Sequence, residues 1–513
     1  MDATLTNTHR RFRPPFGDIV KFGLLAGVVL TLYQQVPAAI WATEQMQLVM
    51  AIGAIGVWRY SWWFVHFARA QIYQRWVYPT VRRRAEELWN TGWRPRSLNF
   101  MMTTYKEHPD TTEAVLAGIL REISDVGVNA RLFIGLGDKS DEDVIENYLR
   151  IHANNMPIEV VFIRQNKPGK RFAIGLTLRA MARAGISGDD PIVFLDGDSI
   201  IQPTCLRKCL PLFALKPKME ALTTDEKVIV HGPRWIQAWL DMRFAQRHLA
   251  MQSHALSNKV LTLTGRMSVF RAQNALRLDF IRTIEADHLD HWLWGDFRFL
   301  SGDDKSTWYW LLRHGADMLY VPDALVVTVE RIEGNGRQRM VQNLLRWSGN
   351  ILRNGARAMA LGPRRTGFFT WWCLLDQRIA IWTTLFGPTL ALLTSIFVSP
   401  WFFVVYLSWV AVTRTLLSLM LFPYAGKINL AFPVMLYANQ LLNAVVKAYL
   451  LFRLPKQRWM NRGDQRSSLG KNNWQTRIRW YMASYLTAFW AGLFVFTLAV
   501  YLGLIKPIPI RFG

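Results

Sequence analysis

Apolar segments long enough to cross a bilayer stand at both ends of this 513-residue chain and enclose a middle part of different character. They cover residues 19–36, 46–67, 379–398, 401–422, 430–452 and 483–504. Apolar stretches of about 20 residues are typical of membrane-spanning helices, because a helix satisfies its own backbone groups in lipid. We therefore predict an N-terminal transmembrane hairpin in residues 1–70, and interfacial helices with a C-terminal transmembrane region in residues 351–513.

The formal net charge of +24 narrows the classes of partner. In a soluble protein such an excess would favour nucleic acid, but the basic clusters 9–13, 82–84 and 364–365 adjoin apolar segments, as cytoplasmic flanks of membrane helices do. We therefore predict that the partner is a lipid bilayer and not nucleic acid. Arg414 and Lys447 lie inside apolar segments, so they are candidates for a polar pathway, with snorkelling at helix ends as the alternative.

Between residues 94 and 350, short apolar runs alternate with helical patterns. The runs that indicate strands are 97–102, 131–136, 158–163 and 191–195, and the patterns that indicate helices are 111–126, 142–153 and 172–183. This repeated strand–helix order predicts a mostly parallel, Rossmann-like sheet with right-handed crossovers. In such a sheet, ligands bind beyond the carboxyl ends of the strands.

Polar clusters follow the predicted strands at those ends: 103–107, 137–138, 166–171 and 196–198. The spacing of Asp196 and Asp198 suits a divalent cation held against a diphosphate. A lone aspartate after a strand is more often a turn or cap residue, but successive clusters on one sheet edge favour a ligand site. No glycine-rich phosphate loop follows the first strand, which disfavours a P-loop ATPase or a Rossmann dehydrogenase.

Later motifs add further candidates. The run 301–305, Ser-Gly-Asp-Asp-Lys, precedes a predicted helix at 306–314, and the run 342–347, Gln-Asn-Leu-Leu-Arg-Trp, lies on a helix that leads toward the membrane half. Gly265 and Arg266 follow a predicted strand at 260–264 and border a ligand site or form an ordinary turn. The run 287–291 has helical spacing compatible with metal ligation, but an acceptor-side or purely structural role is favoured over it.

These motifs together resemble those of the processive family-two glycosyltransferases, the group that contains cellulose, chitin and hyaluronan synthases. Down to the run 101–109, Met-Met-Thr-Thr-Tyr-Lys-Glu-His-Pro, the layout is most similar to that of the catalytic subunits of bacterial alginate (polymannuronate) polymerases. The resemblance implies a membrane α/β protein. Its GT-A-like sheet domain, residues 94–350, would be cytoplasmic and inserted between transmembrane helices of the bacterial inner membrane.

The resemblance also implies a role for each matched residue. Asp304 corresponds to the catalytic general base, and Asp196 and Asp198 correspond to ligands of Mg²⁺, with Mn²⁺ as the alternative. The residues implied to bind the donor nucleotide and its diphosphate are Thr103, Tyr105, Glu107, Asp138, Lys170 and Arg346. Those implied to bind the acceptor are Trp347, Gly265 and Asp303. The family's Gln-x-x-Arg-Trp element has its glutamine where this chain has Asn343, one place after Gln342, so both are weaker candidates.

The implied reaction is inverting, processive transfer of mannuronate from GDP-mannuronic acid to a growing polysaccharide that crosses the inner membrane. The implied partners are a membrane-anchored, cyclic-di-GMP-binding co-polymerase and an envelope export complex. The alternatives within enzymes are a cellulose-, chitin- or hyaluronan-like synthase that uses a UDP-sugar, and a non-processive lipid glycosyltransferase. A membrane transporter without transferase activity is the alternative from another class, and it leaves the clustered carboxylates unexplained.

Overall fold

The computed structural model describes residues 16–41, 43–167, 169–425, 431–459, 465–466 and 474–505. The basic cluster 9–13 lies outside these residues, and so does part of residues 453–479, a basic stretch between the apolar segments 430–452 and 483–504.

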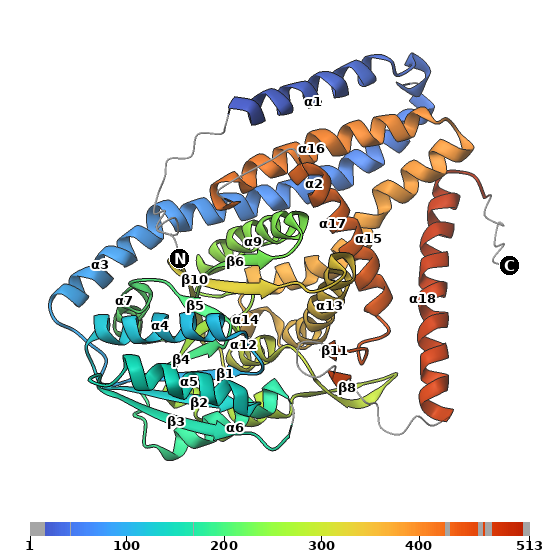
Figure 1. The fold of residues 1–513 in the computed structure, drawn as a ribbon. Helices are drawn as coiled ribbons and strands as arrows, with labels where there is room; N and C mark the ends of the chain where they lie inside the picture. Colours follow the sequence, from blue (N-terminus) through green and yellow to red (C-terminus); the bar gives the residue numbers. More distant parts are fainter. Residues whose placement is uncertain are drawn as a thin grey trace.

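An eight-stranded sheet, in the order β3-β2-β1-β4-β7-β6-β10-β5, organises the middle of the chain (Figure 1). Its strands are β1 Leu98–Thr104, β2 Ala130–Leu136, β3 Ile158–Arg164, β4 Pro191–Asp196, β5 Ser199–Ile201, β6 Met219–His231, β7 Met267–Arg271 and β10 Asp317–Arg331. Neighbouring strands pair in parallel from β3 to β4 and again between β6 and β10, whereas β7 and β5 run antiparallel to their neighbours. The predicted mostly parallel sheet is confirmed.

The crossover helices of the first half are α4 Pro109–Val126, α5 Lys139–His152 and α6 Lys170–Arg183. Their apolar faces bury the sheet, and every side chain of β1 is buried. The pairing register places Thr103 opposite both Gly135 and Asp196, so the carboxyl ends of β1, β2 and β4 lie level. The polar clusters predicted to follow these strands therefore share one edge of the sheet.

Two of the predicted elements are wrong. Residues 260–264 form no strand, because the carbonyls of Val260 and Leu261 accept hydrogen bonds from the Trp308 indole (2.7 Å) and from the Lys305 ammonium instead of from a neighbouring strand. Both donors lie on α12 Asp303–Arg313. The run 287–291 is not helical, because β8 His288–His291 pairs with β9 Gly295–Arg298 in a hairpin. Successive side chains of β8 therefore alternate between faces, so the helical spacing considered for metal ligation is absent.

Long helices cover one side of the sheet domain (Figure 1). Among the described residues, three helices are long and apolar enough to cross a membrane: α15 Phe368–Phe397, α16 Trp401–Ala425 and α18 Trp474–Tyr501. The other predicted spans also form helices, α1 Phe16–Gln34, α2 Thr43–Ile72 and α17 Ala431–Leu450, and α1 contains a shorter apolar stretch, Val20–Gln34. The described structure thus supports three of the predicted spans.

Two further long helices connect the sheet to the membrane helices. α9 Arg234–Ala255 packs on β6 and β10 with one part of its surface and on α2, α16 and α17 with another. α13 Gly336–Ala360 packs between α12 and the pair α15 and α17. The sheet domain is therefore connected to the membrane helices through the packed surfaces of α9 and α13.

The remaining elements are short or peripheral. The helices are η2 Ala38–Trp41, η3 Tyr73–Val77, α3 Tyr78–Asn90, α7 Cys205–Cys209, α8 Pro211–Leu215, α10 Ala272–Ala275, α11 Leu278–Glu285 and α14 Gly362–Thr366. A two-stranded pair, β11 Arg458–Trp459 and β12 Gln465–Arg466, precedes α18.

Candidate active site

A cavity of about 1290 Å³ begins at the sheet edge and extends between the membrane helices. At the sheet edge, its walls include the side chains of Asp196, Asp198 and Asp304. Farther on, its walls are residues of α2, α15, α16 and α17. The polar clusters of the sheet edge and the polar groups of the apolar helices therefore border one continuous space.

The Asp196-Gly197-Asp198 turn is held in place by β1. The backbone N–H of Gly197 donates to the carbonyl of Thr103 (3.0 Å), and a Cβ on Gly197 would lie 2.7 Å from the Cβ of Thr104. Any larger residue at position 197 would push the turn away from β1. Thr103 itself is buried and does not line the cavity, so it supports the aspartates through its backbone.

Lys170 links the two acidic clusters. Its Nζ lies 2.6 Å from Oδ1 of Asp196 and 3.1 Å from Oδ2 of Asp303. Burial raises the pKa of Asp196 to about 6, although the Lys170 charge opposes that rise. The start of α6 therefore places a cation between Asp196 and Asp303, one aspartate of each cluster.

The aspartate pair fits a divalent cation that shares its coordination with a phosphate ligand. In the part of the chain that the structure describes, no group of three or more His, Cys, Asp or Glu side chains is placed to hold a metal. Mg²⁺ is commonly bound by one or two carboxylates together with water and phosphate oxygens, so Asp196 and Asp198 provide a sufficient set. Mn²⁺ also accepts carboxylate and water oxygens.

Asp303 and Asp304 open α12 and have contrasting environments. Gly302, which precedes them, has a φ of +87°, and a Cβ there would lie 2.8 Å from Cγ of Asn350, so this position requires glycine. Burial alone would raise the pKa of Asp303, but Lys170 and Arg171 lower it below the ordinary value. Burial, aided by the Asp303 charge, raises the pKa of Asp304. Of two adjacent carboxyl groups, Asp304 is therefore the better proton acceptor.

Arg346 and Trp347 enter the same cavity from α13. Neither Asn343 nor Gln342 lines the cavity, but Asn343 accepts a hydrogen bond from Nη2 of Arg346 (3.3 Å). The Trp347 ring stacks on Trp239 with centroids 5.9 Å apart and planes 24° apart. Asn343 and not Gln342 therefore takes the position from which a side chain can orient the arginine.

The remaining predicted residues divide into two groups. Tyr105, Glu107 and Gly265 line the cavity, and a Cβ on Gly265 would lie 3.1 Å from Oδ2 of Asp196. Asp138 does not line it. Its Oδ1 accepts from the N–H (3.0 Å) and Oγ (2.8 Å) of Ser140, as a helix N-cap does.

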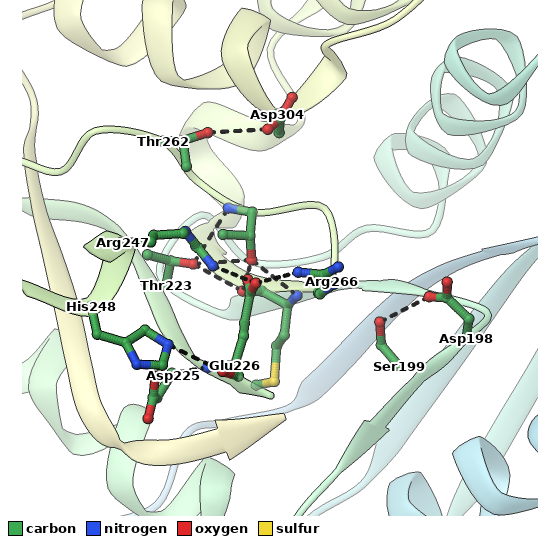
Figure 2. A network of polar contacts seen from close by, with 12 residues as sticks. Asp198, Ser199, Thr223, Asp225, Glu226, Arg247, His248, Thr262, Arg266 and Asp304 are labelled. Atoms are coloured by element: carbon green, nitrogen blue, oxygen red, sulfur yellow. Dashed lines mark hydrogen bonds and ion pairs between the residues drawn. The ribbon is translucent and has the colours of Figure 1, made fainter. Parts of the chain in front are cut away.

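Glu226 and Arg247 also line the cavity, and the sequence patterns did not single them out (Figure 2). Glu226 lies on β6 and forms ion pairs with Arg247 of α9 and with Arg266 of the loop before β7. A sequence signal for this cluster was the i,i+4 spacing of Arg243 and Arg247, which places two cations on one face of a helix.

Comparisons with known proteins place this chain among glycosyltransferases. A family model described as glycosyltransferase like family 2 matches residues 95–350. Glycosyltransferase alg8 of Pseudomonas syringae pv. tomato (strain ATCC BAA-871 / DC3000) is 36% identical over 474 residues, which cover 91% of this chain and 95% of that protein. Glycosyltransferase alg8 of Azotobacter vinelandii is 35% identical over 482 residues, covering 92% and 97%.

Among solved structures, a mannosyltransferase from Pyrobaculum calidifontis, in complex with GDP-Man and Mn²⁺, has a TM-score of 0.43 and 14% identity, over 79% of this chain and 98% of that chain.

The family match covers the sheet domain, and the relatives match nearly the whole chain, membrane helices included. The predicted fold class, a GT-A-like mostly parallel sheet domain combined with apolar helices able to cross a membrane, is confirmed. The predicted enzyme class is confirmed as well: this chain belongs to the alg8 family of glycosyltransferases, within glycosyltransferase family 2.

Proposed function

We propose that this glycosyltransferase is an inverting, processive polymerase that builds the alginate precursor polymannuronate from GDP-mannuronic acid and passes the chain across the bacterial inner membrane. The observation that carries the proposal is the single cavity shared by the aspartates of the sheet edge and the residues of the membrane helices. A product that forms at Asp304 can pass from the sheet edge into the space between the membrane helices without first entering the water on the side of the catalytic domain. The similarity to alg8 glycosyltransferases supports the choice of polymer.

The chemistry follows from the positions of three groups. In direct displacement, Asp304 accepts the proton of the acceptor hydroxyl while that oxygen bonds to the anomeric carbon, and the bond from that carbon to the diphosphate breaks on the opposite face. Arg346 and Lys170 stabilise the charge of the departing diphosphate, and Trp347 offers an aromatic face to the acceptor sugar. A divalent cation held by Asp196 and Asp198 would neutralise further leaving-group charge.

The membrane part of the cavity suits an anionic chain. Among the described lining residues, α2, α16 and α17 contribute Arg59, Arg414 and Lys447, while no carboxylate from α2, α15, α16 or α17 faces the cavity. Burial lowers the pKa of Arg243 on α9 to about 10, which leaves it cationic at neutral pH. Within the described residues, no carboxylate lies at ion-pair distance from Arg243 or Lys447. Buried charges without a counter-ion are costly, so a polyanion in the cavity would stabilise Arg243 and Lys447.

We also propose the organisation that the sequence predicts. Residues 1–70 would anchor the chain, residues 94–350 would form the cytoplasmic catalytic domain, and residues 351–513 would complete a multi-pass membrane region. A cyclic-di-GMP-binding co-polymerase and an envelope export complex would be the partners. Arg453 and Arg479 do not line the cavity: Arg453 donates to Thr487 (2.6 Å) and Arg479 to the Trp294 carbonyl (2.9 Å), so we assign the polymer path to Arg414 and Lys447.

A panel of nucleotide sugars tests the proposed donor. Membranes that contain the protein and its co-polymerase should release GDP from GDP-mannuronate in the presence of Mg²⁺, with formation of polymer. Membranes without the protein provide the background. Release of UDP from a UDP-sugar, with none from GDP-mannuronate, would replace the proposed substrate by that of another polysaccharide synthase.

Substitution of Arg414 tests the polymer path. Arg414 donates to the Tyr60 hydroxyl (2.6 Å), and its Nε is buried with no hydrogen-bond partner among the described residues. In Arg414→Gln, we expect the ratio of exported polymer to GDP released to fall about tenfold, which corresponds to ~1.4 kcal/mol of lost attraction. The matched control is Arg364→Gln, an exposed arginine outside the cavity. An unchanged ratio in Arg414→Gln would contradict the proposed path.

A further inference from the structure

The Glu226, Arg247 and Arg266 side chains form a charged cluster beside the reaction centre (Figure 2). One oxygen of Glu226, Oε2, accepts from Nη1 of Arg247 and from Nη1 of Arg266, the latter at 2.7 Å. Glu226 is 1% exposed, whereas the two arginine side chains are about one-fifth exposed and face the cavity. Two guanidinium groups share one carboxylate, so the cluster carries a net charge of +1.

The cluster also contains buried polar atoms without partners. Within the described structure, neither Oε1 of Glu226 nor Nη2 of Arg247 has a hydrogen-bond partner. A buried donor and a buried acceptor left unpaired each cost about 1–3 kcal/mol, so such atoms are expected to bind a ligand or water. The Arg247 donor, on a side chain that borders the cavity, would match a carboxylate, whereas Oε1 of Glu226 lies on a covered side chain.

The position of the cluster indicates which sugar it meets. Arg266 follows Gly265, which approaches Asp196 so closely that a Cβ would lie 3.1 Å from Oδ2 of that aspartate. The carbonyl of Arg266 accepts from the backbone N–H of Asp196 (3.4 Å). Arg266 thus stands beside the aspartates proposed to hold the diphosphate. Trp347, proposed to hold the acceptor sugar, lies on α13, and the guanidinium of Arg243 on α9 lies 4.5 Å from the centroid of its ring.

The arginines are held in fixed orientations. The guanidinium of Arg266 lies 4.8 Å from the centroid of the Phe244 ring, and Glu226 fixes one nitrogen of each arginine. Burial would raise the pKa of Glu226, but the two arginines lower it to about 2, so the carboxylate stays ionised. A guanidinium fixed through one nitrogen can still offer its remaining N–H groups to a second carboxylate.

We propose that Arg247 and Arg266, positioned by Glu226, bind the carboxylate of the donor sugar and thereby select a uronic acid over the neutral hexose. This assignment rests on the proposed function and adds the residues that distinguish the substrate class. Glu226 is a positioning residue, because it orients the arginines and is itself covered. A neutral donor would leave both arginines without their second anion and would therefore be a poorer substrate.

The test compares two donors on each variant, in membranes that contain the full-length protein and its co-polymerase. GDP release is measured with GDP-mannuronate and with GDP-mannose, and the readout is the ratio of the two kcat/KM values. A site built for a polar substrate group rejects analogues that lack it by large factors, so we expect a wild-type ratio of about 100 or more. In Arg266→Gln and Arg247→Gln, the ratio should fall at least tenfold, to about 10 or less.

Controls separate selection from folding. The amount of folded enzyme cancels in the ratio, and Arg266→Lys, which keeps the charge but loses the planar fork, should retain part of the preference. Lys227→Gln, an exposed neighbour of Glu226 on β6, should leave the ratio unchanged. Equal loss of turnover with both donors in Arg266→Gln would overturn the assignment. If the wild-type protein released GDP from neither donor, the proposed function would fail, and this assignment with it.

Discussion

Asp304→Asn should lower the rate of glycosyl transfer by about 100- to 10,000-fold, the usual contribution of a general base. Asparagine keeps the shape of the side chain and can still accept the hydrogen bond from Oγ1 of Thr262 (3.1 Å), but it cannot take the proton of the acceptor hydroxyl. The loss should appear in kcat, because Asp304 acts only while the bond forms. GDP release at saturating GDP-mannuronate measures it.

The pH dependence provides a second measurement on the same group. The base must be ionised to accept a proton, and burial together with the Asp303 charge raises the pKa of Asp304. The wild-type rate should therefore fall as the pH drops through this raised pKa, at a higher pH than an ordinary aspartate would give. Asp143→Asn, an exposed aspartate near the start of α5, is the matched control and should leave rate and profile unchanged. Retention of more than about one-tenth of the wild-type rate by Asp304→Asn would contradict the assignment.

The sequence predicts the first half of the sheet well, because each strand and the helix that follows it are local and periodic. Thr103 and Asp196 are adjacent in the sheet because β1 and β4 pair in parallel, as the strand–helix repeat requires. The Gly302-Asp303-Asp304 turn was predictable for a related reason: the motif itself contains the glycine that its positive φ demands.

The other wall of the site depends on contacts that local patterns do not contain. Glu226 lies on β6, which is connected to β4 in the sheet through the antiparallel strand β7. Its ion-pair partners are distant in sequence, because Arg247 lies on α9 and Arg266 lies in the loop before β7. Residues 260–264 are apolar enough for a strand, but side chains of α12 donate hydrogen bonds to the carbonyls of Val260 and Leu261. α2 likewise brings Arg59 and Tyr60 to the cavity, a contact that no local motif indicates.

Asp198→Asn and removal of divalent cations should each abolish transfer, since a metal ion stabilises leaving-group charge by several kcal/mol, on the order of 1,000-fold or more in rate. Asp196 forms an ion pair with Lys170 at 2.6 Å, whereas the Asp198 carboxylate accepts a hydrogen bond from the Ser199 hydroxyl at 3.2 Å, so Asp198 is the freer ligand for a cation. Chelation followed by Mg²⁺ or Mn²⁺ should restore GDP release in the wild-type protein and not in Asp198→Asn. A readout independent of turnover is the unfolding temperature, which GDP with Mn²⁺ should raise in the wild-type protein only. The matched control is Asp189→Asn, in the exposed turn before β4, which should behave like the wild-type protein. Transfer by Asp198→Asn without a metal ion would show that the aspartate pair does not bind the catalytic cation.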